Sequence, residues 1–237
     1  MLDWDTRTRA LLGDQAMEKL QRSRVAVIGL GGVGSYAAEA LVRCGVGNML
    51  LVDPDRIEAS NLNRQLPALQ STIGLYKVDV LQQRFRDIAP GVQVEVLRMV
   101  YNKANSHHIL GESLDYVVDA IDSLPEKVHL MESCLNRNLA IVSAMGAANR
   151  LDPAAFRAAD ISETSICPMA RVVRRQLRQR GIERGIKVVY STEPPHSTMD
   201  PTKLGTVSFV PPAAGLLMAS VVVRDLISTS GELDHEG

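Results

Sequence analysis

The sequence predicts a doubly wound α/β fold with a mainly parallel, Rossmann-like sheet and a C-terminal α/β extension. Through residues 1–145, short aliphatic runs alternate with longer segments whose apolar residues recur at three- and four-residue spacing. A glycine-rich turn, GLGGVG at 29–34, stands between the first run and the first longer segment. Strands that alternate with helices in this way form a parallel sheet that is covered on both faces.

The core elements follow from length and periodicity. Buried strands are expected at Arg24–Ile28, Asn48–Val52, Val92–Leu97, Tyr116–Ala120 and Ala140–Ser143. Helices are expected at Val33–Cys44, Leu75–Ile88 and Lys127–Asn136. The carboxyl ends of these strands should therefore form one edge of the sheet, where ligands of such folds bind.

The second half of the chain departs from this alternation. Residues 151–187 are polar and rich in arginine, and 192–203 contains three prolines and is expected to be a loop. Further elements are expected as strands at Val188–Ser191 and Thr206–Val210 and a helix at Ala213–Ile227. Because Pro211 and Pro212 interrupt the uncharged window 204–223, we expect a buried helix shorter than the about 20 residues of a membrane span.

Size and composition restrict the class of protein. The chain has 237 residues, 46% of them hydrophobic and 22% charged, and a formal net charge of −1. We expect one domain, with a core (1–145), an insertion that faces the substrate (146–205) and a closing segment (206–237). Near-zero charge excludes a globally basic nucleic-acid binder but permits a local basic patch. Three cysteines without a CxxC pair argue against a disulfide framework or a four-thiolate zinc site and favour the reducing cytoplasm.

The glycine-rich turn predicts a nucleotide site. Gly29, Gly31, Gly32 and Gly34 follow a strand and open a helix, so backbone N–H groups can approach a phosphate at the positive end of that helix. Asp53 ends the next strand, where a carboxylate can accept hydrogen bonds from ribose hydroxyls. A turn required only for helix–sheet packing is the alternative, and the motif does not choose among nicotinamide, flavin and ATP.

The polar residues after Asp53 favour a triphosphate. Cleavage of a triphosphate requires cations and amide donors around the phosphates. A second carboxylate, two neutral donors and two cations follow along the chain: Asp55, Asn61, Gln65, Arg64 and Lys77. Each of these would be an ordinary surface residue by itself. Together they indicate a phosphate site, because they follow a strand that ends in an acidic residue.

Two aspartates close the fourth strand. Asp119 and Asp122 should face the nucleotide because they lie at the carboxyl end of a parallel strand. Asp122 is a candidate Mg²⁺ ligand, since Mg²⁺ is commonly held by one or two carboxylates together with substrate phosphates. The alternative for either residue is capping of the helix that starts near Pro125.

Four motifs in this order resemble the ubiquitin-activating-enzyme-like adenylyltransferases, the ThiF/MoeB/HesA superfamily. They are GLGGVGS, DPDRIEASNLNRQ, GLYKVDV and DAIDS, within residues 5–145. The resemblance implies ATP and Mg²⁺ as cofactors. It implies that Asp53 holds the ribose and that Asp122 binds Mg²⁺. It also implies that four residues surround the phosphates: Asn61, Arg64, Gln65 and Lys77. It also implies a homodimer in which an N-terminal arginine reaches the ATP of the other subunit. Arg7 matches that arginine best, and Arg9 is the second choice.

The C-terminal half resembles one branch of this superfamily. Relatives that activate sulfur-carrier proteins have two zinc-binding CxxC pairs, which this chain lacks. The segments 164–178, 188–195 and 205–212 are instead similar to the enzymes that dehydrate threonylcarbamoyladenosine in tRNA. That resemblance implies ATP-dependent adenylylation of the threonyl carboxylate and closure to a cyclic hydantoin. A monovalent cation and a sulfur-transfer partner protein are left open.

An arginine-rich segment gives tRNA a place to bind. Four guanidinium groups recur at helical i, i+3, i+4 and i+7 spacing, namely Arg171, Arg174, Arg175 and Arg178. One face carrying these charges would neutralise several phosphates. An ordinary solvated face is the alternative.

Other readings stay open at this point. Cys167 is either a nucleophile or a buried thiol, and His196 has a weak claim as a substrate contact. Two other functions remain: adenylation of the C-terminal glycine of a ubiquitin-like carrier, and a nicotinamide oxidoreductase or non-catalytic nucleotide binder.

Overall fold

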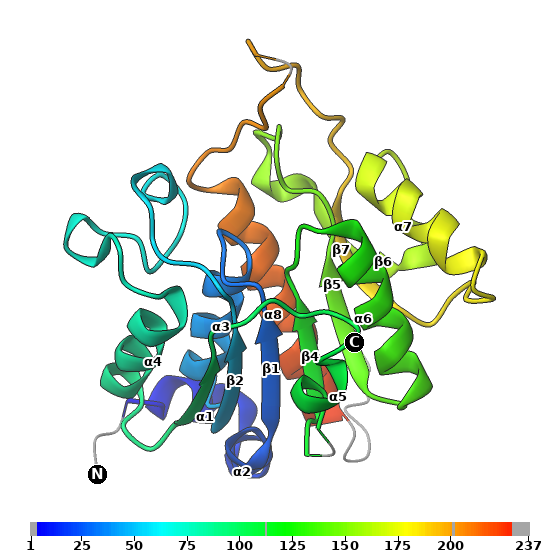
Figure 1. Cartoon of the computed structure of the whole chain (residues 1–237). Coiled ribbons are helices and arrows are strands. Elements are labelled where there is room, and N and C mark those ends of the chain that lie inside the picture. Colours follow the sequence, from blue (N-terminus) through cyan, green and yellow to red (C-terminus); the bar gives the residue numbers. More distant parts are fainter. Residues whose placement is uncertain (1–3, 112, 201, 229–237) are drawn as a thin grey trace.

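The computed structural model describes residues 4–111, 113–200 and 202–228, and in it seven strands form one sheet (Figure 1). The strand order is β3-β2-β1-β4-β5-β7-β6. All neighbours pair in parallel except β6, which is antiparallel to β7. The strands are β1 Arg24–Ile28, β2 Asn48–Val52, β3 Gln93–Leu97, β4 Tyr116–Asp119, β5 Ala140–Ala144, β6 Phe156–Asp160 and β7 Lys187–Ser191. The expected doubly wound, mainly parallel fold is confirmed.

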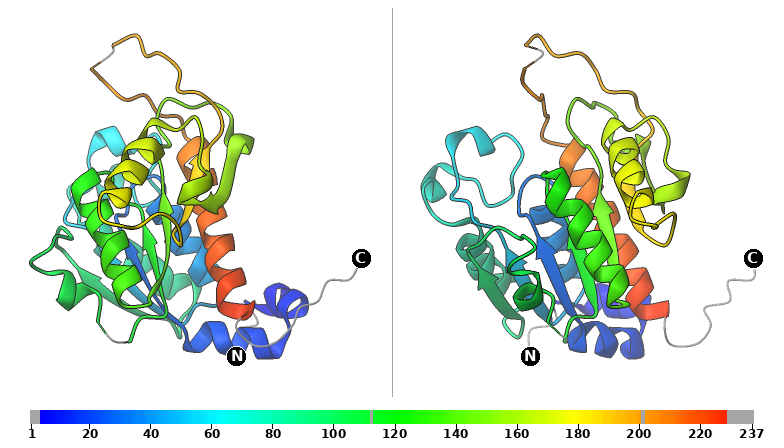
Figure 2. Two further views of the ribbon diagram at one scale, coloured as in Figure 1. Left: turned by 90° about the vertical axis from the view of Figure 1, so that its right-hand side faces the viewer. Right: turned by 45° about the vertical axis from the view of Figure 1, so that its right-hand side comes forward.

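Helices cover both faces of the sheet (Figure 2). They are α1 Thr6–Leu12, α2 Asp14–Arg22, α3 Gly34–Arg43, α4 Lys77–Ile88, α5 Ser106–Ile109, α6 Leu124–Asn136, α7 Pro168–Arg178 and α8 Val210–Ser228. Short 3₁₀ turns occur at η1 Ala59–Asn61, η2 Gln70–Thr72, η3 Pro153–Ala155 and η4 Ile161–Glu163. One hydrophobic cluster joins one sheet face to α2, α3, α4 and α8, and a second joins the other face to α5, α6 and α7.

The order of the strands positions a ligand site. The chain runs outward from β1 through β2 to β3 and then returns to β4 on the other side of β1. Connections therefore leave the carboxyl ends of β1 and β4 in opposite directions, which is where α/β sheets of this type bind ligands.

Helix α8 is longer than expected, and the strand expected at Thr206–Val210 is wrong. Residues 204–207 pair with no strand among the described residues, and the helix already begins at Val210. Pro211 and Pro212 occupy the first helical turn, where backbone N–H groups have no intrahelical partner, so the prolines do not interrupt the helix. By length and composition α8 resembles a membrane span, but most of it is buried against α3 and the sheet. It is the buried core helix that was expected.

Both ends of α8 are fixed. Near its start, a Cβ on Gly215 would lie 2.3 Å from the carbonyl oxygen of Val33, so only glycine allows the two helices to approach this closely. Near its end, the carboxylate of Asp225 accepts hydrogen bonds from the Tyr116 hydroxyl at 2.6 Å and from Lys187 Nζ at 2.6 Å. Tyr116 and Lys187 begin β4 and β7, so α8 extends along the full depth of the sheet.

Strand β6 and helices α1, α2 and α5 were not expected from the sequence. Strand β6 has the sequence FRAAD, and of its residues only Phe156 is buried, so it lacks an aliphatic run. Helix α2 buries Met17 and Leu20, whereas α1 has no buried residue at all. The closing segment continues to residues 229–237, which lie outside the described residues.

Candidate nucleotide-binding site

The glycine-rich turn connects β1 to α3 in a conformation that only glycine permits. Gly29 has a φ of +91°, and a Cβ there would lie 2.7 Å from the carbonyl oxygen of Ala120. A Cβ on Gly34 would lie 1.8 Å from the carbonyl oxygen of Gly29. Because no side chain fills this turn, a phosphate can approach the backbone N–H groups at the start of α3.

Asp53 attaches the end of β2 to this turn. Its carboxylate accepts hydrogen bonds from the N–H of Leu30 at 2.6 Å and of Asp55 at 2.8 Å. The side chain is 4% exposed, and this burial raises its pKa despite the nearby Lys77 ammonium and the two N–H donors. An ionised carboxylate has further acceptor sites, so Asp53 can also accept bonds from a ribose.

Lys77 is a buried cation at the first residue of α4. Its Nζ lies 2.8 Å from Asp55 Oδ2 and 3.8 Å from Asp53 Oδ1. Asp55 is well exposed, so this ammonium group has one solvated counterion and one buried one. The arrangement holds a positive charge beside the strand end at which the expected ribose carboxylate lies.

Arg64 and Gln65 lie against the glycine turn. A Cβ on Gly32 would be 3.3 Å from Arg64 Cγ, and one on Gly31 would be 3.9 Å from Gln65 Nε2. The Oε1 atom of Gln65 is buried and has no hydrogen-bond partner among the described residues. Such an acceptor is costly to bury alone, and an N–H or O–H group of a bound ligand is one way to satisfy it.

Asn61 builds the loop that carries Arg64. Its Oδ1 accepts a hydrogen bond from the N–H of Glu58 at 3.0 Å, and its Nδ2 donates to Ser60 Oγ at 3.3 Å. Arg64 Nη1 donates to the carbonyl oxygen of Ser60 at 2.9 Å and to Asn63 Oδ1 at 2.8 Å. Arg64 thus keeps other donors for a ligand, whereas the amide of Asn61 is already engaged.

Asp119 and Asp122 have different surroundings. Asp119 is fully buried, and its carboxylate accepts hydrogen bonds from Lys127 Nζ at 2.8 Å, Ser143 Oγ at 2.5 Å and the N–H of Ile121 at 3.0 Å. Asp122 is exposed, and no side chain in the described part of the protein pairs with it. The buried partners Lys127 and Ser143 were missed by sequence reasoning, because a lysine inside a helix gives no signal of burial.

The donor set is compatible with Mg²⁺ only when a phosphate-bearing ligand completes it. In the described chain, no group of three or more His, Cys, Asp or Glu residues is placed to hold a metal ion. A single free carboxylate at Asp122, beside a phosphate site, fits the ordinary habit of Mg²⁺ to use one or two carboxylates together with substrate phosphates.

The structure does not bring the N-terminal arginines to this site. Helix α1 lies at the opposite end of the sheet from the glycine turn (Figure 1). Arg7 is exposed on this helix. Arg9 is held by ion pairs with Asp5 at 2.8 Å and Asp14 at 2.7 Å. Of the two candidates, Arg7 is therefore the one with no ion pair to a described residue.

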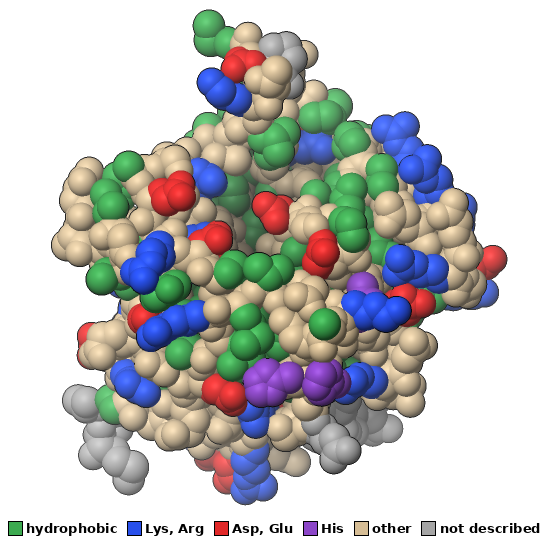
Figure 3. All heavy atoms as spheres, in the orientation of Figure 1, with side chains coloured by type: hydrophobic (Ala, Val, Ile, Leu, Met, Phe, Trp, Pro, Cys, Tyr) green, Lys and Arg blue, Asp and Glu red, His purple; other side chains and the backbone are tan. Residues whose placement is uncertain are grey.

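Helix α7 carries the four predicted arginines, but only three of them are exposed. Arg171, Arg175 and Arg178 are exposed, and basic side chains lie over this helix in Figure 3. Arg174 instead turns toward η4 and donates hydrogen bonds to Thr164, at 2.7 Å to its carbonyl oxygen and also to its hydroxyl. Three free guanidinium groups remain on this helix face.

Cys167 is a buried thiol in front of α7. It is 2% exposed and lies close to the end of β5, where a Cβ on Gly146 would be 3.8 Å from its sulfur. Cys134 packs within α6, where burial raises its pKa to about 12, and Cys44 lies in the turn that follows α3. All three thiols are free in this structure.

The loop expected at 192–203 is confirmed, and a set of contacts fixes it to the segment after β5. The carboxylate of Glu193 accepts the N–H of Leu151 at 3.1 Å and of Asp152 at 3.0 Å, and it pairs with His196 Nε2 at 2.6 Å. Burial would raise the pKa of Glu193, but these hydrogen bonds outweigh it and lower the pKa. The nearly buried Arg150 donates to the carbonyl oxygen of Glu193. His196 is therefore engaged within the fold.

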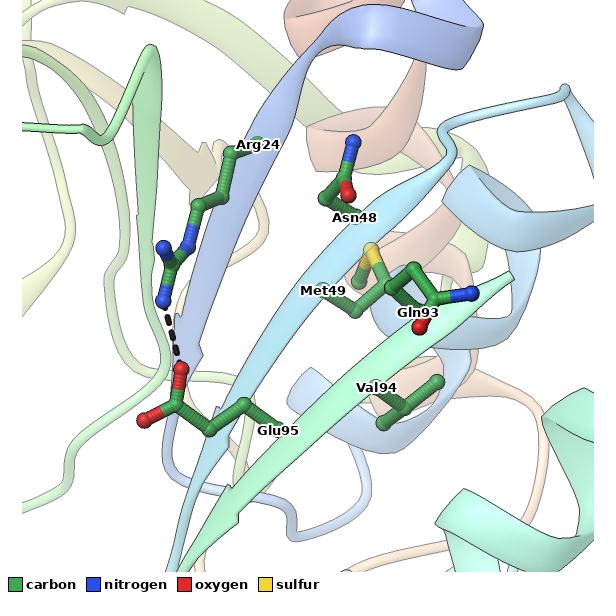
Figure 4. A pocket seen from close by; sticks show the side chains of 6 residues that line it. All are labelled: Arg24, Asn48, Met49, Gln93, Val94 and Glu95. Carbon is green, nitrogen blue, oxygen red and sulfur yellow. Dashed lines mark hydrogen bonds and ion pairs between the residues drawn. The ribbon is translucent and has the colours of Figure 1, made fainter. Parts of the chain in front are cut away.

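A hollow of about 260 Å³ lies elsewhere, at the amino-terminal ends of β1, β2 and β3 (Figure 4). Arg24 Nη2 and Glu95 Oε2 form an ion pair of 2.5 Å beside it. It lies at the edge of the sheet opposite the glycine turn, so it is not part of the nucleotide site.

Comparison with known proteins identifies the family of this chain. The model of the ThiF family matches residues 5–235. This chain belongs to the ThiF family. Similar family members include the tRNA threonylcarbamoyladenosine dehydratase of Bacillus subtilis, 44% identical over 96% of each chain. The SAMP-activating enzyme E1 of Haloferax volcanii is 34% identical but matches 55% of this ThiF family chain and 48% of its own length.

A solved structure is also similar. The Escherichia coli tRNA N6-threonylcarbamoyladenosine dehydratase in complex with ATP superposes with a TM-score of 0.89, at 30% identity and 97% coverage of both chains. The corresponding complex with AMP gives a TM-score of 0.90.

Proposed function

We propose that this ThiF family chain is an ATP-dependent tRNA threonylcarbamoyladenosine dehydratase. The observation that carries this conclusion is the match along both halves of the chain, including the arginine-rich second half, to dehydratases, one of which has been crystallised with ATP and with AMP. The relative that activates a protein modifier matches only about half of the chain.

The reaction has two covalent steps. An oxygen of the threonyl carboxylate attacks the α-phosphorus of ATP, the bond to the β-phosphate oxygen breaks, and pyrophosphate leaves. A nitrogen of the same substituent then attacks the activated carbonyl carbon and loses its proton, and the carbon–oxygen bond to AMP breaks. The substrate loses the elements of one water, and ATP becomes AMP and pyrophosphate.

This chain's residues contribute chiefly position and charge. The N–H groups of Gly31, Gly32 and Gly34, with Arg64, Gln65 and Lys77, surround the phosphates. Asp53 accepts bonds from the ribose, and Asp55 holds the ammonium of Lys77 in place. Asp122 would hold Mg²⁺, which when bound neutralises phosphate charge and draws electrons from the α-phosphorus.

Arg7 completes the site of a second subunit in this proposal. Within one chain it lies at the end of the sheet away from the glycine turn, on a helix without a buried residue. Both features are those expected of a helix that is covered by another copy of the chain, so we assign a homodimer with Arg7 directed at the partner's ATP.

The tRNA lies along α7 in this proposal, across the insertion 146–205. Arg171, Arg175 and Arg178 neutralise backbone phosphates there, and Arg174 positions the preceding turn through Thr164. We assign the enzyme to the cytoplasm, where tRNA is available and thiols such as Cys167 stay reduced.

Mass spectrometry of nucleosides tests the function. Incubation of modified tRNA with enzyme and ATP is expected to convert threonylcarbamoyladenosine to a product lighter by one water. Omission of ATP, or the Asp122→Asn enzyme, should leave the nucleoside unchanged. An unchanged nucleoside with the native enzyme would contradict the proposal, and pyrophosphate exchange that requires a ubiquitin-like carrier would support the alternative.

A further inference from the structure

One exposed aromatic side chain lies beside the nucleotide site. Phe209 is 51% exposed, whereas the other phenylalanines, Phe85 and Phe156, are buried in the core. A surface phenylalanine is unremarkable alone, but this one adjoins the phosphate-binding turn.

Two contacts fix the position of Phe209. It directly precedes α8, and in the first turn of that helix Pro211 Cβ lies 3.0 Å from the place that a Cβ on Gly32 would occupy. Upstream, Asn63 Nδ2 donates a hydrogen bond to the carbonyl oxygen of Thr206 at 3.2 Å. The segment from Thr206 to Pro211 is therefore held between the loop that carries Arg64 and the glycine turn, which places the exposed Phe209 next to the candidate site.

Other exposed or nearby aromatic residues are less suited to meet a ligand here. Among the Phe, Tyr and Trp side chains of the described residues, Trp4 is the other exposed one, but it adjoins α1 at the far end of the sheet. Tyr76 is covered by guanidinium groups, with Arg56 at 3.9 Å and Arg98 at 4.8 Å from its ring centre.

The chemistry of the proposed reaction requires the base to lie close to the phosphates. The threonyl carboxylate that attacks ATP is joined to the adenine N6 through a carbamoyl group, a span of about 5 Å. The adenine must therefore rest at the rim of the nucleotide site, out of the tRNA stack. Proteins hold such unstacked bases against aromatic side chains.

We propose that the ring of Phe209 stacks on the adenine of the threonylcarbamoyladenosine substrate. This inference rests on the proposed dehydratase function and adds a specific substrate contact to it. Stacking holds the base, so that its substituent reaches the α-phosphate that the glycine turn and Arg64 position.

Steady-state kinetics of Phe209 variants test the stacking contact. In Phe209→Ala the KM for modified tRNA is expected to rise about 10-fold. The affinity for ATP, measured by thermal shift without tRNA, should be unchanged. Phe209→Tyr and Phe209→Trp should retain a low KM, whereas Phe209→Leu should behave like the alanine variant because it cannot stack. Leu216→Ala is a matched control, since Leu216 is 52% exposed on α8 and should not affect the KM.

The outcomes separate this inference from the function on which it rests. If native enzyme forms no dehydrated nucleoside, the proposed function itself fails. If native enzyme is active and Phe209→Ala has an unchanged KM for tRNA, stacking alone is refuted. A Phe209→Leu enzyme with a KM for tRNA as low as that of Phe209→Tyr would also refute stacking. So would a Phe209→Ala enzyme whose only change is in its oligomeric state, measured by light scattering.

Discussion

Lys127 Nζ lies 2.8 Å from Asp119 Oδ2, and both side chains are completely buried beneath the candidate nucleotide site. Ser143 Oγ donates to the same oxygen at 2.5 Å, and the other carboxylate oxygen accepts the N–H of Ile121. This network fixes the turn from β4 to Asp122. Asp119 is thus a support for the metal-binding candidate rather than a ligand itself.

Removal of Lys127 should be strongly destabilising. Lys127→Met leaves the Asp119 carboxylate buried without its counterion, so the free energy of unfolding is expected to fall by about 3–5 kcal/mol. Urea denaturation measures this. The control is Arg180→Met, which breaks the partly exposed ion pair with Glu132 and should cost less than about 1 kcal/mol. Equal losses of unfolding free energy in the two variants would mean that the buried ion pair contributes no more to stability than the partly exposed one.

The Glu39 carboxylate joins α3 to α4 and predicts a pH dependence. It accepts hydrogen bonds from Arg84 Nε at 2.5 Å and from Arg43 Nε at 2.8 Å. Burial would raise its pKa, but the two arginines outweigh burial and hold the pKa below its ordinary 4.5. The ionised form is therefore favoured by folding, and its contribution is present above pH 4.5 and is lost as the pH falls through the lower folded-state pKa.

Glu39→Gln should accordingly reduce the free energy of unfolding by about 1–2 kcal/mol at pH 7. The difference from the native protein should shrink as the pH falls below 4.5. Urea denaturation at several pH values checks both statements. Glu18→Gln serves as control, because Glu18 and Arg22 are both exposed and 3.6 Å apart. If the difference in unfolding free energy between the native protein and Glu39→Gln grew as the pH fell, the predicted direction of the pH dependence would be wrong.

Mixing two inactive variants tests whether Arg7 acts in the partner's site. Arg7→Ala and Arg64→Ala should each lower ATP–pyrophosphate exchange by at least about 100-fold. In a dimer formed from one subunit of each, one of the two sites has both arginines, so mixing should restore about a quarter of the native activity.

Arg9→Ala is the control for this experiment. Arg9 is held by Asp5 and Asp14, so its loss should leave exchange close to native. Absence of recovery in the mixture, with dimers demonstrated by light scattering, would place Arg7 outside the partner's site.

The salt dependence of tRNA binding reports on α7. Replacement of Arg171, Arg175 and Arg178 by Gln should weaken binding and reduce the slope of log K against log salt by about 1 for each lost phosphate contact. Arg174→Gln should instead lower the melting temperature and leave the slope unchanged, because Arg174 bonds to Thr164. Arg86→Gln, an exposed arginine on α4, is the surface control. A native slope in the triple variant would identify this face as merely solvated.

Sequence reasoning could predict a phosphate site because the patterns that indicate one are local. The strand–glycine–helix connection at Gly29 and the carboxylate at Asp53 are properties of short segments. The long-range partners were not accessible in that way. Helical spacing placed Arg174 with its neighbours, but it could not show that Thr164 faces it.

Two further differences have equally physical causes. Strand β6 is an edge strand with one buried side chain, so it lacks the aliphatic run that marks a strand. The prolines after Val210 predicted an interruption of the helix, whereas in the first turn of α8 they remove no intrahelical hydrogen bond. Residues that act between chains, such as the proposed Arg7, are beyond what one chain's periodicity can indicate.

Helix α8 connects two places that the sheet keeps apart. From Pro211, at the glycine turn, to Asp225, at the opposite edge, it is a rigid rod about 21 Å long. Tyr116 and Lys187 hold its far end, so the position of the glycine turn depends in part on contacts made outside the candidate site. A substitution at Asp225 is therefore expected to alter nucleotide affinity even though it changes no residue of the candidate site.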